Sequence, residues 1–112
     1  MNKLKGNKKI SLLFEKGRRI KHFPFRLIYL ENEDVSWGVS VSKKALALAV
    51  DRNQTKRALR EGVKKHLLGL FEKNEKNYCF MILYINNKKL NKKSLENSFI
   101  SLQKLVSKKL GI

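Results

Sequence analysis

The sequence predicts a single α+β domain in which helices pack against a small β-sheet. The chain has 112 residues, 42% of them hydrophobic, which is enough for one modest core. Segments with helical spacing and segments with strand alternation follow one another in the order α-β-β-α-β-α. No repeat or low-complexity linker divides the chain, so residues 1–112 are treated as one domain.

The first element is a short helix behind a basic N-terminal arm. The arm covers residues 1–6 and is expected to be flexible. Ile10, Leu13 and Phe14 then follow helical spacing, and Gly17 is a typical helix stop.

Two strands are predicted after Pro24, which interrupts the chain. Residues 25–30 are apolar and aromatic, and residues 35–42 alternate strictly between apolar and small or polar side chains. The acidic residues 31–34 lie between them and are typical of a turn. We therefore expect the two strands to pair as an antiparallel hairpin.

The second half of the chain contains a long helix, a third strand and a last helix. Asp51 can cap a helix that runs to about Phe71. Residues 78–85 are apolar on both faces, which predicts a central strand covered on two sides. Ser94 is expected to cap the last helix, which carries an apolar stripe. The order of elements describes a small sheet with helices packed against it, an α+β sandwich.

The charge points to a polyanionic partner. Lys and Arg number 26 and Asp and Glu number 9, so the formal net charge is +17. Nucleic acid and an anionic membrane surface are the two candidate partners. The apolar stripes of the helices are needed for the core, which disfavours the membrane. The single cysteine, Cys79, excludes an intrachain disulfide and favours a reducing compartment, so we expect a cytoplasmic protein.

The helix predicted after Asp51 carries its polar residues in an ordered way. At about 100° per residue, several of them fall on one arc beside the apolar stripe. The members of this arc are Asn53, Lys56, Arg57, Arg60 and Lys64. Glu61 is the one acid placed to relieve their mutual repulsion. The uncompensated charge predicts phosphate ligands, with a solvated face as the alternative. Lys43 and Lys44, directly after the second strand, can add a phosphate clamp.

Aromatic residues near basic ones are candidates for stacking on the bases of a single strand. Phe14, Phe25 and Tyr29 lie close in sequence to arginines. Stacking on an exposed ring needs no particular base. Phe14 and Phe25 are equally well explained as core residues. Tyr29 has a polar tip and is the better candidate for a half-exposed platform.

No catalytic constellation emerges from the sequence. His22 and His66 are the two histidines, and no Cys/His or Ser/His/Asp arrangement can be argued from the spacing. His66 lies on the apolar side of its helix and is expected to be packed. Glu31, Glu33 and Asp34 could bind a cation, but acidic residues in a hairpin turn are better explained by solubility.

Two segments resemble a known family. They read Ser40-Val41-Ser42-Lys43-Lys44 and Arg52-Asn53-Gln54-Thr55-Lys56-Arg57-Ala58-Leu59-Arg60-Glu61. With their spacing they resemble the protein subunit of bacterial ribonuclease P, and the likeness extends over nearly the whole chain. The link between the segments is one residue longer than usual, within residues 45–49. The third residue of the second motif is usually Arg and is Gln54 here.

The resemblance implies an accessory subunit of an endoribonuclease. The RNA subunit would be the catalyst and would use Mg²⁺ to remove the 5′ leader of precursor tRNA. The protein would bind this catalytic RNA, in a 1:1 complex, and the single-stranded leader. The resemblance also implies a left-handed crossover from the second strand through the basic helix to the third. The alternative from another functional class is a small structural RNA-binding protein of the ribosomal type, without a role in cleavage.

The resemblance assigns roles to matching positions. Arg52 and Arg57 would face the catalytic RNA, and Asn53, Lys56 and Arg60 would lie toward the leader and a nearby divalent ion. The aromatic positions of the family's leader cleft fall here on Ile10, Phe14 and Ile28, with Tyr29 next to the last of these. No residue is assigned a catalytic role.

Overall fold

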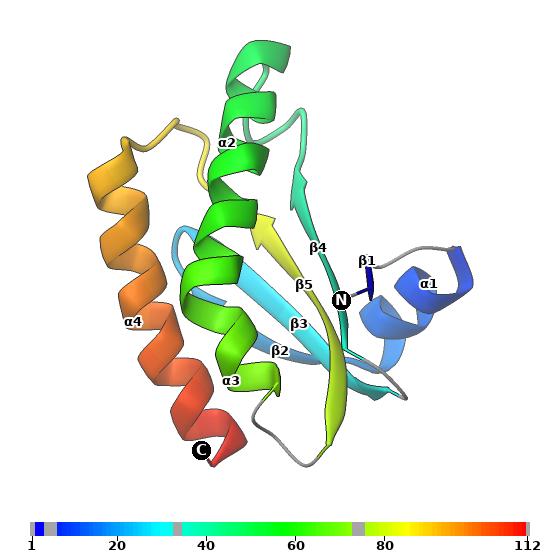
Figure 1. The fold of residues 1–112 in the computed structure, drawn as a ribbon. Helices are drawn as coiled ribbons and strands as arrows, with labels where there is room; N and C mark the ends of the chain where they lie inside the picture. The colour runs from blue at the N-terminus through cyan, green and yellow to red at the C-terminus, as the bar shows by residue number, and fades with distance from the viewer. Residues whose placement is uncertain (1, 4–6, 33–34, 73–75, 112) are drawn as a thin grey trace.

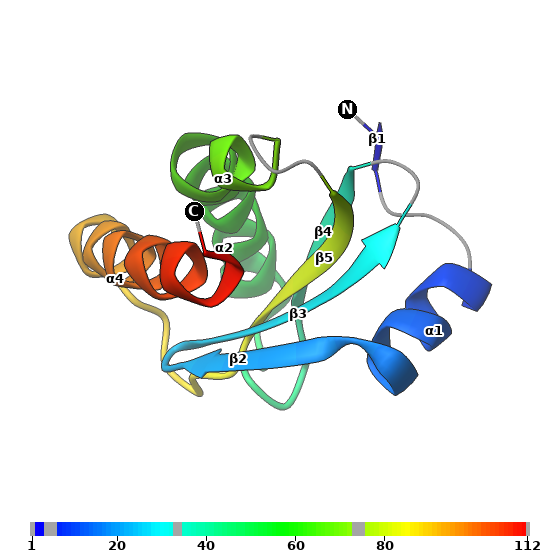
Figure 2. The same ribbon diagram turned by 90° about the horizontal axis from the view of Figure 1, so that it is seen from below.

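The computed structural model describes residues 2–3, 7–32, 35–72 and 76–111. Its elements are β1 (Asn2–Lys3), α1 (Asn7–Lys16), β2 (Arg18–His22), β3 (Phe25–Asn32), β4 (Ser36–Val41), α2 (Ala49–Gly62), the π-helical turn η1 (Val63–Leu67), α3 (Leu68–Glu72), β5 (Asn77–Tyr84) and α4 (Lys92–Leu110). Figures 1 and 2 show that α2, α3 and α4 lie on one face of the sheet and α1 on the other. The predicted α+β architecture is confirmed.

The sheet has the strand order β1-β4-β5-β3-β2, and this corrects the predicted hairpin. β3 and β4 do not pair with each other, because β5 lies between them, antiparallel to β3 and parallel to β4. A strand that is apolar on both faces buries the most surface at the centre of the sheet, and β5 occupies that place as predicted. The hairpin that does form joins β2 to β3.

Strand β2 has no counterpart in the sequence-based prediction. Arg18, Arg19 and Lys21 are exposed on it and only Ile20 is buried. One apolar residue among charged ones is too little to show the alternation by which a strand is predicted. An edge strand tolerates such a pattern because charged side chains there discourage pairing with other chains.

The connection from β4 through α2 to β5 is left-handed. Both strands point upward in Figure 1, α2 lies in front of the sheet, and β5 lies to the left of β4. Figure 2, seen from below, places α2 on the same side of the sheet. About 98% of such parallel connections are right-handed, so the fold is an exception of the kind that the family resemblance implies.

Both predicted helix caps are wrong by a few residues. The long helix begins at Ala49, and Leu48 is its N-cap without a side-chain hydrogen bond, whereas Asp51 lies in the first turn. The last helix begins at Lys92, and Asn91 caps it by accepting from the backbone N of Ser94 at 2.8 Å. Asp, Asn and Ser are all good cap residues, so the choice among neighbours depends on where the chain enters the helix.

Two apolar clusters lie on the two faces of the sheet. The larger one, between the sheet and α2, α3 and α4, is rich in buried aromatic rings. The smaller one, beneath α1, consists of Leu13, Ile28, Cys79 and Met81. Cys79 is buried there, as predicted.

The predicted basic arm and acidic turn fall largely outside the described residues. Of residues 1–6, the structure describes Asn2–Lys3, which pairs in parallel with β4 as strand β1. Glu33 and Asp34 of the acidic turn lie outside the described residues, whereas Glu31 is exposed near the end of β3.

Candidate nucleic-acid interface

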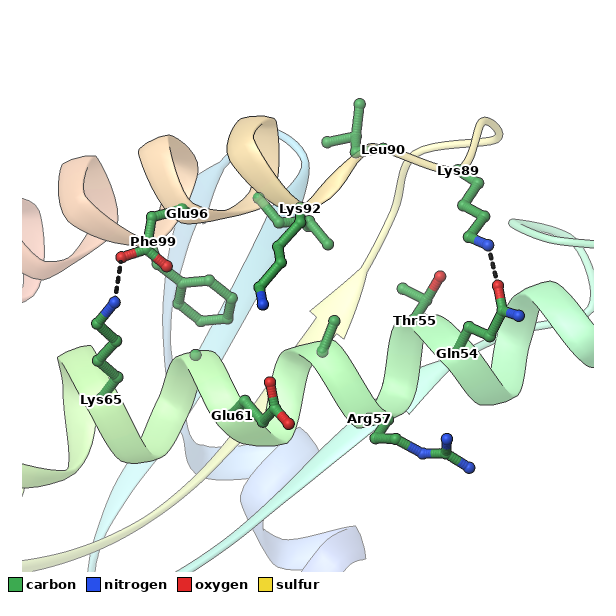
Figure 3. A pocket seen from close by; sticks show the side chains of 13 residues that line it. Gln54, Thr55, Arg57, Glu61, Lys65, Lys89, Leu90, Lys92, Glu96 and Phe99 are labelled. Atoms are coloured by element: carbon green, nitrogen blue, oxygen red, sulfur yellow. Dashed lines mark hydrogen bonds and ion pairs between the residues drawn. The ribbon is translucent and has the colours of Figure 1, made fainter.

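The structure brings the predicted arc together on one flank of α2. Lys56, Arg60, Asn53 and Arg57 span about 100° of the helix circumference, and Lys64 follows one turn later in η1. Lys56 is half-buried and the other four are exposed. Arg57, a member of the arc, points away from α4 (Figure 3). Among the described residues, no carboxylate forms an ion pair with any of these cations.

Lys43 and Lys44 are exposed in a turn that follows β4. Ser42 fixes this turn, because its Oγ accepts from the backbone N of Ala45 at 3.1 Å and its carbonyl oxygen accepts from the N of Leu46 at 3.0 Å. The hydroxyl group therefore orders the backbone that carries the two lysines.

Arg52 lies apart from the arc and supports the loop before α2. Its Nη1 donates to the carbonyl oxygens of Leu46, at 3.0 Å, and Ala47, at 2.8 Å. Loop carbonyls have no partner in regular secondary structure, and a guanidinium group can satisfy two of them at once. The side chain predicted to face RNA thus also holds the loop between Lys44 and the helix.

A groove of about 440 Å³ separates the other flank of α2 from α4, and two polar pairs lie along it (Figure 3). Lys65 Nζ lies 2.8 Å from Glu96 Oε1, and Lys89 donates to Gln54. Arg57 points away from α4, whereas Lys92 reaches from α4 toward α2. Gln54, the departure from the family motif, therefore ties α2 to the loop between β5 and α4.

His66 is packed at this helix contact, as predicted. Its side chain is 9% exposed, its ring stacks on Phe99 at 6.1 Å, and its Nε2 lies 2.9 Å from Glu96 Oε1. The hydrogen bond from Lys65, together with His66, lowers the pKa of the Glu96 carboxyl group despite partial burial. Glu96 on α4 thus pairs with Lys65 and His66 across the helix contact, whereas no ion pair joins a carboxylate to the arc among the described residues.

Two of the residues proposed for a leader cleft are buried, which corrects that prediction. Ile28 is 1% exposed beneath α1, and Tyr29 is 6% exposed on the opposite face of the sheet. Tyr29 has edge-to-face contact with Tyr78 at 5.7 Å and cannot offer a platform to a base. Side chains alternate along β3, so Tyr29 necessarily points away from α1. Phe25 is a core residue as well.

Ile10 and Phe14 lie in α1 and remain partly accessible at the surface. Both are half-buried and pack against the smaller apolar cluster. Arg19 donates to the carbonyl oxygen of Phe14 at 2.6 Å, which holds the end of α1 against β2. Phe14 is therefore the one predicted stacking aromatic whose ring is partly accessible.

The sheet register reveals a strip of residues that the sequence reasoning missed. Ser40, Leu83, Arg26 and Lys21 are successive neighbours across β4, β5, β3 and β2, on the face that α1 partly covers. We call these four residues the open strip. Arg26 and Lys21 are exposed, and Ser40 and Leu83 are half-buried. Lys21 and Arg26 each stand among apolar residues in the sequence. That the two are neighbours follows only from the pairing of β2 with β3.

Comparison with known proteins decides the family. The family model for Ribonuclease P matches residues 1–110. The chain belongs to the ribonuclease P protein family. The ribonuclease P protein component of Streptococcus agalactiae is 31% identical over 106 residues, which are 92% of this chain and 92% of that protein.

Solved ribonuclease P proteins share the fold. The protein from Staphylococcus aureus superposes with a TM-score of 0.77 at 24% identity, over 95% of each chain. The protein from Thermotoga maritima gives a TM-score of 0.74 at 18% identity, over 94% of this chain and 97% of that one.

A Mg²⁺ ion, which ribonuclease P chemistry implies, would meet few oxygen ligands among the described residues. Mg²⁺ prefers six oxygen ligands, and exposed Asn53 offers a single amide oxygen. In the described ranges, no three His, Cys, Asp or Glu side chains group as metal ligands.

The same ranges contain no helix that is long and apolar enough to cross a membrane.

Proposed function

We propose that this chain is the protein subunit of ribonuclease P, which binds the catalytic RNA and the 5′ leader of precursor tRNA. Cleavage of the phosphodiester bond is assigned to the RNA subunit. The observation that carries the proposal is the arc of cations on α2 without carboxylate partners among the described residues. An arrangement that is unfavourable for the isolated protein becomes favourable when phosphates neutralise it.

The catalytic RNA would lie along the outer flank of α2. Arg57 and Lys64 are exposed on this flank, and Lys43 and Lys44, exposed in the turn that follows β4, would add further phosphate contacts. Such contacts read phosphates and not bases, so they position the RNA without selecting a sequence. The complex is expected to contain one protein and one RNA.

The leader would cross the sheet beside α1 along the open strip. Lys21 and Arg26 can bind its phosphates, while Leu83 and the partly accessible ring of Phe14 offer apolar surface to its bases. Strand β4, which contributes Ser40 to the strip, also contacts α2, the helix that carries Lys56 and Arg60. Only the precursor has a leader, so these contacts would favour precursor over mature tRNA.

Mg²⁺ would belong to the RNA subunit and its substrate, with Asn53 as a single contributing ligand at most. The protein's own role is electrostatic, because its net charge of +17 neutralises RNA phosphates that otherwise require Mg²⁺. The expected consequence is activity at a lower Mg²⁺ concentration. We also propose that this complex works in the cytoplasm.

The test is to mix the protein with a bacterial ribonuclease P RNA at a Mg²⁺ concentration too low for the RNA alone. Removal of the 5′ leader should appear on addition of the protein, and the protein without RNA should cleave nothing. Cleavage that survives nuclease treatment of the protein would contradict catalysis by the RNA. RNA binding that neither promotes cleavage nor depends on a 5′ extension would favour a structural RNA-binding protein.

A further inference from the structure

An apolar knob projects at the start of α2. Along the chain it lies between Lys43 and Lys44 on one side and Lys56 and Arg57 on the other. It consists of residues 47–50, all of which are exposed. Leu48 is 67% exposed and Val50 is 65% exposed, more than any other large apolar side chain in the described residues. Figure 1 shows this end of α2 extending beyond the strands.

The knob is held in place and is not a loose end of the loop. Leu46, directly before it, is buried in the larger apolar cluster. Arg52 Nη1 donates to the carbonyl oxygens of Leu46 and Ala47, and the backbone N of Arg52 donates to that of Leu48 at 3.1 Å. A fixed apolar projection costs free energy in water unless a partner covers it.

The surroundings of the knob select the partner. Lys43 and Lys44 precede it and exposed Asn53 follows it, so it lies within the surface proposed to meet RNA. A second copy of this chain would bring like charges together at this point. Two large side chains also provide far less area than the ~800 Å² per partner of a stable protein interface.

The exposed apolar side chains of the knob can pack against unpaired bases. Residues two apart around a helix start do not share one face, so Leu48 and Val50 make the tip apolar on more than one side. Proteins that deform nucleic acids insert apolar side chains such as Leu between bases, and proteins recognise RNA mostly where bases are unstacked.

We infer that the knob packs against unstacked nucleobases of the catalytic RNA and adds an apolar contact to the electrostatic interface. The inference rests on the proposed function, because it requires the flank of α2 to face that RNA. Contacts with phosphates release counterions on binding, whereas an apolar contact does not. The two kinds of contact therefore differ in their dependence on salt.

The experiment measures the affinity of the full chain for ribonuclease P RNA, without tRNA, at several salt concentrations. Leu48→Ser with Val50→Ser should weaken binding about tenfold or more at every salt concentration, with an unchanged log–log slope. Lys43→Ala should instead reduce the slope by about 0.7–0.9. Ile100→Ser on α4, also an exposed apolar residue, is the matched control and should bind like the wild type.

Each outcome bears on a different statement. Failure of the wild type to bind the RNA would overturn the proposed function. Normal binding by the Leu48→Ser, Val50→Ser double variant would overturn the inference alone, and so would weaker binding that appears only when precursor leader is present. Leu48→Met with Val50→Ile should restore the affinity. Thermal unfolding at the wild-type temperature would show that the serine variant remains folded.

Discussion

The two faces of the sheet are covered in different ways. On the α2 and α4 face, aromatic rings fill the space between sheet and helices. Phe71 and Phe80 stack with ring centroids 4.2 Å apart, and the tilted rings of Phe25 and Phe99 have centroids 4.6 Å apart. On the α1 face, a small cluster is buried beneath one short helix, and the open strip remains accessible beside it. The difference indicates that one face mainly stabilises the fold and the other leaves surface for a ligand.

The sharpest test of this difference compares two phenylalanines. Phe99 is 1% exposed at the α2–α4 contact, and Phe99→Ala should lower the free energy of unfolding by about 3–5 kcal/mol. Phe14 is only half-buried on α1, and Phe14→Ala should cost about 1 kcal/mol. Urea unfolding measures both values. Equal losses would contradict the assignment of most stability to one face.

Two glycines, Gly62 at the end of α2 and Gly69 in α3, sharpen the comparison. A Cβ atom on Gly62 would lie 2.2 Å from the ring of Phe99, whereas one on Gly69 meets nothing within 4 Å. Gly62→Ala should therefore destabilise the protein by about 1–3 kcal/mol, because the helices cannot approach as closely. Gly69→Ala should stabilise it by about 0.5–1 kcal/mol through helix propensity. If Gly62→Ala stabilised the protein as Gly69→Ala does, the α2–α4 contact would be looser than described.

The next comparison concerns ligand binding. It sets variants of the open strip, which is proposed to bind the leader, beside a variant of the outer flank of α2, which is proposed to bind the catalytic RNA. Arg26→Ala should weaken precursor tRNA binding by the reconstituted enzyme by up to about tenfold and leave mature tRNA binding unchanged. Lys56→Ala and Arg60→Ala should show the same preference. Arg57→Ala should weaken association with the catalytic RNA itself. Equal losses for precursor and mature tRNA in the Arg26 variant would count against a leader path across the strip.

The smallest expected effect concerns pH and the α2–α4 contact. Lys65 lowers the pKa of Glu96 below its usual value of 4.5, so the ionised carboxylate is favoured in the folded state. This contribution is complete above the usual pKa and is lost as the pH falls through the lowered one. Thermal unfolding of Glu96→Gln should therefore show slight destabilisation at neutral pH that disappears in acid. A difference that grows in acid would contradict the described ion pair.

The sequence predicted those features that depend on local periodicity. The helix ending before Gly17, the basic arc of α2 and the central strand rich in apolar residues are all seen in the structure. The strand order was not accessible, because β5 inserts between strands that precede it in the chain. The open strip follows from that order, so it could not be predicted either. The burial of Tyr29 instead follows from the alternation along β3, which places it on the same face as Phe25 and Leu27.

The charged segment β2 and the helix caps show a second kind of limit. Arg18, Arg19 and Lys21 hide the alternation of a strand whose stability comes from pairing with β3. Asn91 and Ser94 are both good caps, and tertiary packing decides between them. The left-handed crossover was expected only from the family resemblance, because the periodicity of the sequence carries no information on the handedness of a connection.

The central claim is that the outer flank of α2 binds RNA through its phosphates. Its most direct test is the affinity of the intact protein for ribonuclease P RNA, measured across a range of salt concentrations. Five or six phosphate contacts predict a log–log slope of about −4 to −5. An affinity that does not change with salt, or binding no stronger than that to an uncharged polymer, would contradict the account.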